Sequence, residues 1–461
     1  MNGNRKFMVG LMQKRRLLRI GLFWLCLVGL FDGAAAETGR SLDGNAWNGA
    51  GDDPFAHIII SGDEEPYSAS DHGAGSDVTL TLRHEYGAGV SHGPETIVNR
   101  SSLRFQMDRT VFDLFFFRFD GRATLFYPED HQTRSRKTNP QARPEIREWY
   151  IQKGNDALSF RVGKQIVVWG ETDGDVINDV VSPRDHREFI FTELEDARLG
   201  QFMATANLYT EKGDVFLFLA APQVDELPDR GTRYDKLPEE MAVNRHRPDG
   251  SDLEIGGKWR QRFHRFDLSL MAASLLQNSG VTRGDMAEGY GLTYPRYEFY
   301  GFGLRGTRGN FSVAMDGSLK DHYQLERENG CGRLAANRSL LADTGFFMEY
   351  DANGAYTLSL EVDYRRILSL KERSAGIRRD HASLYGQYRK TFWHDTVIFR
   401  YVFYRQLQDR HHFHQAEMEY IYSDHIRISF DAAFFHSPDR QDSFWPYRNE
   451  DRIGVDVSYW F

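Results

Sequence analysis

From residue 76 to the end of the chain, hydrophobic and polar side chains alternate in short runs separated by breaks. In Tyr356–Leu368, Tyr, Leu, Leu, Val and Tyr occupy every second position, and Thr, Ser, Glu, Asp and Arg fill the positions between them. Successive side chains of a β-strand point to opposite faces, so each run predicts a strand with one apolar and one polar surface. Roughly 18 such runs, the first at Asp77–Tyr86 and the last at Arg452–Phe461, predict an all-β protein.

The breaks between the runs are alternately short and long. Short breaks such as Glu211–Asp214 and Thr307–Asn310 combine Gly with Asp or Asn, which is typical of hairpin turns. Long breaks such as Gly170–Gly200, Pro222–Asp252, Asn278–Pro295 and Tyr323–Asp343 lie between them, and the first of these follows a strand predicted over Ala157–Trp169. A membrane barrel whose strands run up and down has tight periplasmic turns and large extracellular loops. The sequence therefore predicts a transmembrane antiparallel β-barrel of roughly 18 strands, in the range of about 16–18, rather than a soluble β-sandwich.

Several charged residues fall on the polar face of the predicted strands. A charged side chain on the lipid-facing surface costs roughly 2–4 kcal/mol at the membrane midplane, so the charged face has to line the lumen. A barrel of this width is too wide for side chains to fill, and its interior is expected to contain water. The residues assigned to the lumen are Arg161, Glu361, Asp363, Arg365, Arg389, Arg400, Arg427 and Asp431.

Residues 1–36 have the three parts of a secretory signal peptide. A basic stretch at Lys14–Arg19 precedes an apolar stretch at Ile20–Phe31, and Ala34–Ala36 supplies small residues at the expected cleavage site. Residues 37–75 are rich in Gly, Asp and Ser and are expected to form a loose periplasmic leader, which leaves residues 76–461 for the barrel. Residues 1–36 contain six Lys or Arg and one Asp, so their removal changes the formal net charge from −9 to −14. This charge argues against nucleic acid as a partner.

The break with the largest net charge is the third long one, residues 171–199, which is expected to fold into the lumen as a constriction. It contains nine acids and three arginines, and also apolar residues such as Val176, Ile177 and Phe189–Phe191 that need cover. Acids and arginines opposed across a narrow waist would set a transverse field on permeating solutes. A solvated surface loop is the alternative. The residues assigned to the constriction are Glu171, Asp173, Asp175, Asp179, Arg184, Asp185, Arg187 and Glu188.

The segment RVGKQIVVWGETDGDVINDVVSPRD, residues 161–185, resembles a large family of Gram-negative outer-membrane barrels. That family is catalogued as a domain of unknown function and is grouped with alginate-export and other porin-like barrels. The resemblance implies a porin-like barrel in the outer membrane, with its third loop in the lumen. The positions that carry it are Gly163, Gln165, Trp169, Gly170, Asn178, Pro183 and Asp185.

These observations predict an outer-membrane channel for the passive or facilitated passage of small polar or charged solutes. The alternative is that the barrel is a component of an envelope export or electron-transfer complex, with periplasmic proteins as partners. No enzyme, cofactor or metal site is predicted. The cluster His411, His412 and His414 is interpreted as a polar loop rather than a metal site, and Cys331 is the only cysteine after residue 36. No local sequence signature favours a barrel hydrolase.

The last predicted strand, Arg452–Phe461, has apolar side chains at every second position and ends on an aromatic residue. This pattern is similar to the closing-strand signal of bacterial outer-membrane barrels, which the barrel-assembly machinery reads. Tyr459 and Phe461 are therefore the expected assembly signal, and the assembly machinery and outer-membrane lipid are the expected partners.

Overall fold

The computed structural model describes residues 76–91, 93, 95–112, 114–133, 139–172, 174–187, 194–235, 243–245, 247–248, 252–285, 289–329, 333–369, 378–408, 411–438 and 444–461. The predicted signal peptide and leader lie outside these residues, as do Asp173 and Glu188. Within the described part of the chain, no helix is long and apolar enough to cross a membrane.

Eighteen strands form the wall of a barrel. They are β1 (Ser76–Gly89), β2 (Glu95–Val111), β3 (Phe115–Phe126), β4 (Gln141–Gly154), β5 (Leu158–Gln165), β6 (Gln201–Leu208), β7 (Asp214–Ala220), β9 (Glu254–Arg262), β10 (Phe266–Leu276), β13 (Arg296–Arg308), β14 (Phe311–Asn329), β15 (Arg333–Asp351), β16 (Thr357–Ile367), β17 (Asp380–Phe392), β18 (Val397–Gln406), β19 (His412–Ser423), β20 (Ile426–His436) and β21 (Arg452–Trp460). Between them lie the short strands β8 (Val243–Arg245), β11 (Val281–Asp285) and β12 (Gly289–Thr293), the helical turn α2 (Leu194–Ala197) and the 3-10 turn η2 (Trp445–Tyr447).

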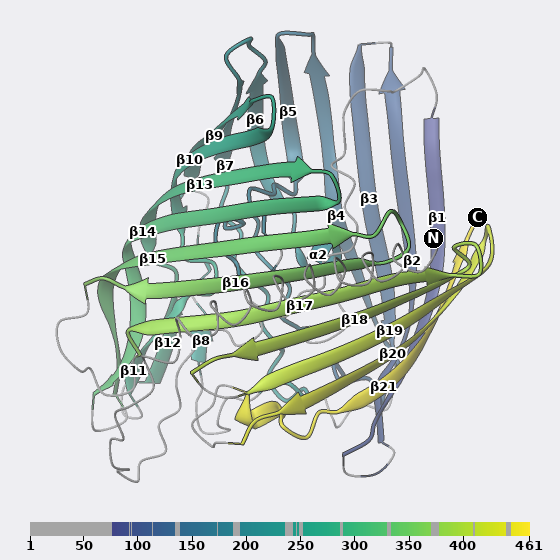
Figure 1. Ribbon diagram of the computed structural model, residues 1–461. Coiled ribbons are helices and arrows are strands. Elements are labelled where there is room, and N and C mark those ends of the chain that lie inside the picture. The colour runs from purple at the N-terminus through teal and green to yellow at the C-terminus, as the bar shows by residue number, and fades with distance from the viewer. Residues whose placement is uncertain are drawn as a thin grey trace, which may run out of the picture. The chain divides into compact units, whose positions relative to one another are not determined.

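Each wall strand pairs antiparallel with its neighbours in sequence, and β21 pairs with β1, so the sheet closes on itself. Leu82 lies opposite Tyr459 at this seam, and Figure 1 shows β1 and β21 side by side. A closed sheet has no edge strand, so the backbone donors and acceptors of the wall find partners within the wall itself. The prediction of an all-β antiparallel barrel of about 18 strands is confirmed.

The strand boundaries differ from the prediction at three places. The predicted loop over residues 323–343 is wrong, because β14 and β15 continue as a paired hairpin as far as Asn329 and Arg333. The strand predicted over residues 157–169 ends at Gln165. The predicted loops 222–252 and 278–295 contain β8, β11 and β12, which pair with one another.

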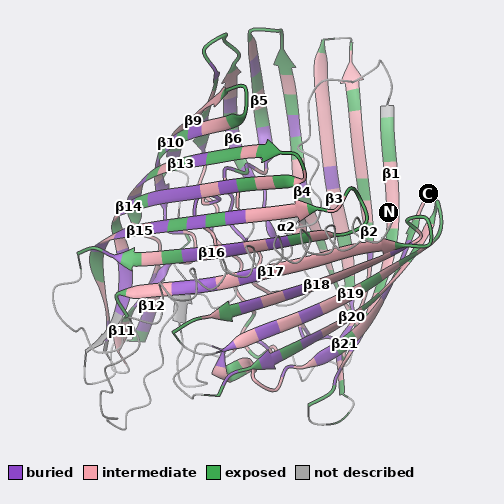
Figure 2. Ribbon diagram, in the orientation of Figure 1, coloured by how far each residue is buried: buried purple, intermediate pink, exposed green. Residues whose placement is uncertain are grey.

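Residues of differing burial follow one another along the wall strands (Figure 2), and the outer and inner faces differ in their side chains. On β16, the side chain of Leu358 is 51% exposed on the outer face, whereas Glu361 is 0% exposed on the inner face. The turn between β15 and β16 shows how the hairpins close. Asn353 and Gly354 both have positive φ, 54° and 78°, as a two-residue hairpin turn requires.

Gly163 of β5 occupies a position that only glycine fits. Its φ is +141°, and a Cβ added there would lie 2.7 Å from the Cα of Tyr150 and closer still to the carbonyl oxygen of Trp149, both on the neighbouring strand β4. Any larger residue would have to move the backbone of β4.

We expect Gly163→Ala to destabilise the folded barrel by about 1–3 kcal/mol, because both the backbone conformation and the space are unavailable to alanine. The measurement is the temperature at which the folded, faster-migrating gel form is lost. Gly291→Ala is the matched control, since an added Cβ at that position meets nothing within 4 Å. Equal transition temperatures for the two variants would contradict this account of Gly163.

Candidate functional site

Between β5 and β6, the described part of residues 166–200 leaves the wall and folds into the barrel, and we call it the inserted segment. Its described residues are 166–172, 174–187 and 194–200. It includes the predicted third loop, residues 171–199, and α2, which Figure 1 shows between opposite walls of the barrel. The segment begins where β5 stops pairing with β6, at the pair Gln165 and Gln201.

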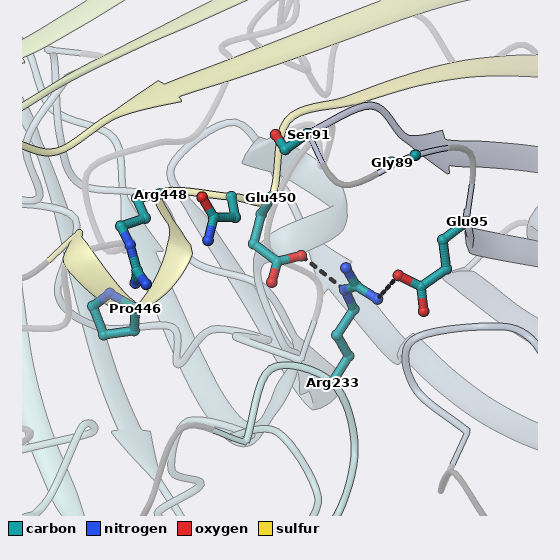
Figure 3. Close-up of a pocket in the computed structure, with 9 residues that line it drawn as sticks. Gly89, Ser91, Glu95, Arg233, Pro446, Arg448 and Glu450 are labelled. Carbon is teal, nitrogen blue, oxygen red and sulfur yellow. Dashed lines mark hydrogen bonds and ion pairs between the residues drawn. The ribbon is translucent and has the colours of Figure 1, made fainter.

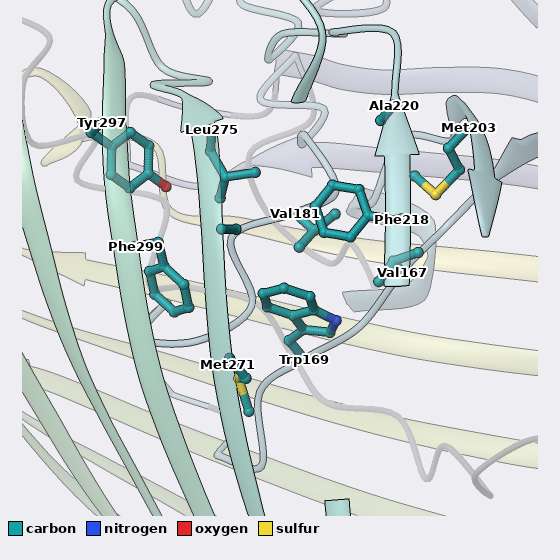
Figure 4. Close-up of a cluster of buried hydrophobic side chains, with 11 residues drawn as sticks. Val167, Trp169, Val181, Met203, Phe218, Ala220, Met271, Leu275, Tyr297 and Phe299 are labelled. Atoms are coloured by element: carbon teal, nitrogen blue, oxygen red, sulfur yellow. The ribbon is translucent and has the colours of Figure 1, made fainter. Parts of the chain in front are cut away.

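The first anchor of the inserted segment is an apolar cluster around Trp169 (Figure 4). The Trp169 side chain is 1% exposed, and its ring centroid lies 5.6 Å from that of Phe218 on β7 and 6.2 Å from that of Phe299 on β13. Val181, from the same segment, and Met271 of β10 complete the contact. Truncating a buried aromatic side chain typically costs about 3–5 kcal/mol, so this cluster alone holds the start of the segment firmly.

The second anchor is the carboxylate of Asp316, on the inner face of β14. Its Oδ2 accepts hydrogen bonds from the backbone N–H of Glu171 and Thr172, at 2.8 and 3.1 Å, and from Oγ1 of Thr172 at 3.0 Å. Its Oδ1 accepts one from Nδ2 of Asn178 at 2.7 Å, and the same amide also donates to the carbonyl oxygen of Phe302 on β13 at 2.8 Å. A single buried carboxylate therefore satisfies donors from both arms of the segment.

The tip of the inserted segment reaches β16 and β17. The backbone N–H of Asp175 donates to Oδ2 of Asp363 at 3.3 Å, and Oγ of Ser383 donates to the Asp175 carboxylate at 2.8 Å. A Cβ added to Gly174 would lie 2.8 Å from Oε1 of Glu361 and 2.9 Å from Oδ2 of Asp363, so the backbone lies directly against these carboxyl groups. The segment thus crosses the interior from β5 to β17.

A buried ion-pair cluster fixes the returning arm. The Asp179 carboxylate accepts hydrogen bonds from Nη2 of Arg184 and from Nε of Arg198, both at 2.9 Å. Burial by itself would raise the pKa of Asp179, but the charges of Arg198 and Arg184 outweigh it and hold the pKa below the ordinary value of 3.8. Asp179 therefore stays ionised and acts as a structural counter-ion inside the segment.

Asp196 of α2 ties the segment to the opposite side of the wall. Arg104 of β2, Arg122 of β3 and Arg147 of β4 lie 3.6, 3.4 and 3.4 Å from its carboxylate. Burial would raise the pKa of Asp196, but these three charges lower it well below the ordinary range. The three arginines lie on consecutive strands and repel one another. Asp196 and Asp120 of β3 lie among them and offset this repulsion.

The remaining residues assigned to the constriction are also paired. Oε1 of Glu171 lies 3.4 Å from Nζ of Lys258 on β9, and Arg187 forms an ion pair with Asp185 at 2.6 Å. Burial would raise the pKa of Asp185, but its hydrogen bond and charge interaction with Arg187 lower it. Asp173 and Glu188 lie outside the described residues. The described acids assigned to the constriction hold the segment in place. The sequence pattern does not distinguish this anchoring role from a role in contacting solutes.

The residues assigned to the lumen lie on the inner face, on two parts of the wall. Arg365 pairs with Asp343 of β15 at 2.9 Å, and Asp343 also binds Lys320 of β14 at 2.7 Å. Arg400 and Arg427 lie 3.3 and 3.6 Å from Glu417 and Glu419, both on β19. Arg161 donates to Oε1 of Gln152 at 2.7 Å. In the strand register, Arg389 lies opposite Arg400, and Asp431 lies opposite Glu417. Glu361 and Asp363 lie against the tip of the inserted segment.

Sequence reasoning missed the wall residues that receive the inserted segment: Arg104, Arg122, Arg147, Lys258, Asp316, Lys320, Asp343 and Ser383. Each is a polar residue at an inward position of a strand whose alternate positions are apolar. That pattern marks them as lumenal but does not pair them with residues 166–200. Their pairing depends on barrel closure.

A second set of contacts lies at the end of the barrel away from the short turns (Figure 3). Arg233, from the loop after β7, forms ion pairs with Glu95 of β2 at 3.0 Å and with Glu450, next to η2, at 2.8 Å. The adjoining cavity has a volume of about 280 Å³, below the usual size of a ligand pocket. Beside it, Tyr234 and Phe444 belong to a buried aromatic cluster with Phe413 and Phe435. These contacts join the loop after β7 and the loop before β21 to the start of β2.

In the part of the chain that the structure describes, no group of three or more His, Cys, Asp or Glu residues is arranged to hold a metal ion. The site is therefore a closed 18-strand barrel with a structured segment across its interior, and its chemistry is that of hydrogen bonds and ion pairs.

Comparisons with known proteins agree with this class of fold. Residues 99–213 match a family described as a protein of unknown function (DUF1302), and this range contains all the positions of the family resemblance. The link to alginate-export barrels stays a prediction. No curated protein sequence matches the chain.

Two solved structures have similar folds. OccK8 (OprE) of Pseudomonas aeruginosa is 9% identical with a TM-score of 0.52, and the match covers 84% of this chain and 98% of that one. OccAB1 of Acinetobacter baumannii is 9% identical with a TM-score of 0.50, and the match covers 84% of this chain and 96% of that one. At these identities the similarity is one of fold alone.

Asp179→Asn is expected to weaken docking of the inserted segment by about 3–5 kcal/mol, because it leaves Arg184 and Arg198 buried without their counter-ion. The wall strands keep their hydrogen bonds, so the circular dichroism spectrum should remain that of a barrel while proteolysis within residues 171–199 accelerates. Asp214→Asn, at an exposed strand end, is the control. Unchanged proteolysis in Asp179→Asn would contradict the anchoring role of Asp179.

Docking of the inserted segment is also expected to depend on pH in one direction. The pKa values of Asp179, Asp185 and Asp196 are lowered in the folded protein, so their stabilisation is fully present above the ordinary value of 3.8 and is lost as the pH falls through the lowered values. The part of the segment's protease resistance that these three carboxylates supply should therefore be lost only below about pH 4. A transition near neutral pH would mean that other groups control docking.

Proposed function

We propose that this protein is a channel of the Gram-negative outer membrane that passes small polar or charged solutes through the barrel, past the inserted segment. The observation that carries the proposal is the segment itself. It crosses the lumen on anchors to at least eight strands, and a wide barrel needs such a constriction to be selective. The apolar outer surface of the closed barrel supports placement in a membrane.

The route that we propose for the solute follows the inner faces of β19, β20, β21 and β1. None of the anchors described above reaches these four strands. Their inner faces carry both arginines and acids, which form ion pairs such as Arg427 with Glu419 and Arg83 with Asp456. Arg427 also lies over the Trp460 ring, with 4.9 Å between the guanidinium carbon and the ring centroid. A wall of alternating charges favours polar solutes that carry both donors and acceptors over simple ions of one sign.

We further propose that Tyr459 and Phe461 act in assembly of the barrel. Both side chains lie on the outer face, and their rings pack edge to face at 4.6 Å. The Phe461 N–H donates to the carbonyl oxygen of Leu80 on β1, at the seam that closes the barrel. The barrel-assembly machinery and the surrounding lipid are the proposed partners at this surface.

Removal of residues 173–195, with a short Gly–Ser linker in their place, should raise the single-channel conductance several-fold without unfolding the barrel. The strands that flank the segment keep their pairing down to Gln165 and Gln201, and the lumen would lose its constriction. The measurement is single-channel recording in planar bilayers. Replacement of the same residues by a Gly–Ser stretch of equal length is the control for chain length.

Both variants should conduct more than the wild type, because a Gly–Ser stretch lacks the Asn178 and Asp175 side chains that bind Asp316 on β14 and Ser383 on β17. If the excised protein folds and its conductance equals that of the wild type, the segment does not control passage. If neither wild type nor variant conducts, the channel proposal itself fails.

A further inference from the structure

The outer face of the barrel carries a group of basic and aromatic side chains where β18, β19 and β20 end at the side of the long loops. We call it the outer basic patch and define it by Tyr401, Arg405, His412, His414 and His436. Arg405 lies directly opposite His412 on the neighbouring strand, and His412 lies directly opposite His436. Three basic residues therefore form one row across three strands.

The outer basic patch lies at the edge of the apolar surface. On β20, the outward positions before His436 are Ile426, Ile428, Phe430, Ala432 and Phe434, and the Phe430 and Phe434 side chains are 48% and 46% exposed. At a rise of about 3.3 Å per residue and a tilt of about 40°, this stretch covers roughly 20 Å of height, most of the apolar band of about 25 Å that a membrane barrel presents. His436 therefore lies where the acyl chains end and the lipid headgroups begin.

The side chains of the patch contact one another. The His412 and His436 rings stack at 4.6 Å, His414 meets His412 edge to face at 5.1 Å, and the Tyr401 hydroxyl is 2.6 Å from Nδ1 of His414. Neither Arg405 nor His436 forms an ion pair with any residue that the structure describes. The exposed Arg405 guanidinium is therefore available to an anion, and the imidazole N–H groups beside it can donate to the same anion.

We propose that the outer basic patch binds the phosphate groups of lipopolysaccharide-type lipids in the outer leaflet. Arg405 supplies a permanent charge and a planar donor fork suited to phosphate, and the stacked histidines supply further N–H donors beside it. Phe430 and Phe434 lie below the row, where the acyl chains of the same lipid would pack. The proposal rests on the outer-membrane placement given above, and it assigns to this face a bound lipid rather than a role in solute passage.

The test is binding of fluorescently labelled lipid A in dodecyl maltoside micelles at pH 6 to the purified full-length barrel. Arg405→Gln, His412→Gln and His436→Gln combined should weaken binding at least about tenfold, and the wild-type affinity should fall as salt is added, because screening weakens contacts with phosphate. The matched control combines Arg308→Gln, His394→Gln and His425→Gln. These residues are exposed at the opposite, short-turn end of the wall and should leave binding unchanged.

The proposal is overturned if the patch variant binds lipid A as tightly as the control, or if phosphatidylcholine binds to the wild type as tightly as lipid A. If millimolar inorganic phosphate displaces all of the bound lipid A, the patch is a site for free phosphate, and the lipid proposal is also overturned. The gel mobility of unheated samples establishes that each variant is folded, and Arg405→Gln alone provides a milder variant. Single-channel conductance should equal that of the wild type in both variants, so failure here is distinct from failure of the channel proposal.

Discussion

Polar groups that the inserted segment carries into the barrel have to find partners there, because a buried donor or acceptor without a partner costs free energy. The backbone N–H groups of Glu171 and Thr172 meet this constraint through the single carboxylate of Asp316. The arginines of the returning arm meet it through Asp179. The described charged residues of the segment are therefore paired with one another or with the inner wall, and these pairs hold the segment in position.

This constraint also explains why the inward-facing residues of β14 to β17 differ from those of β2 to β4. Where the segment docks, Asp316 and Asp363 at inward positions of β14 and β16 accept hydrogen bonds from it, and Ser383 on β17 donates one to its Asp175 carboxylate. On β2 to β4 the inward positions hold arginines that converge on Asp196. Between these docking surfaces, β19 to β21 carry arginines and acids that pair along the wall itself, such as Arg427 with Glu419.

Most of the fold could be predicted from the sequence, since a strand with one face toward lipid and one toward the lumen alternates with a period of two. The extended hairpin of β14 and β15 could not, because residues 323–343 beyond the apolar band have no lipid face to impose the pattern. The entry of residues 171–199 into the lumen follows from their apolar residues. Their wall partners do not, since Asn178 and Asp316 are 138 residues apart in sequence and meet only when the barrel closes.

The central claim is that the tip of the inserted segment rests on β17 in the assembled protein, and a cross-link tests it directly. Asp175→Cys with Ser383→Cys, in a Cys331→Ser background, places two thiols where the native side chains are 2.8 Å apart. A short bifunctional thiol reagent applied to membranes should join residues 175 and 383 in most molecules, as mass spectrometry of the linked peptides would show. The pair Asp175→Cys and Ser429→Cys, with the second residue on β20, should remain unlinked. Free thiols at both positions of the first pair would contradict the account.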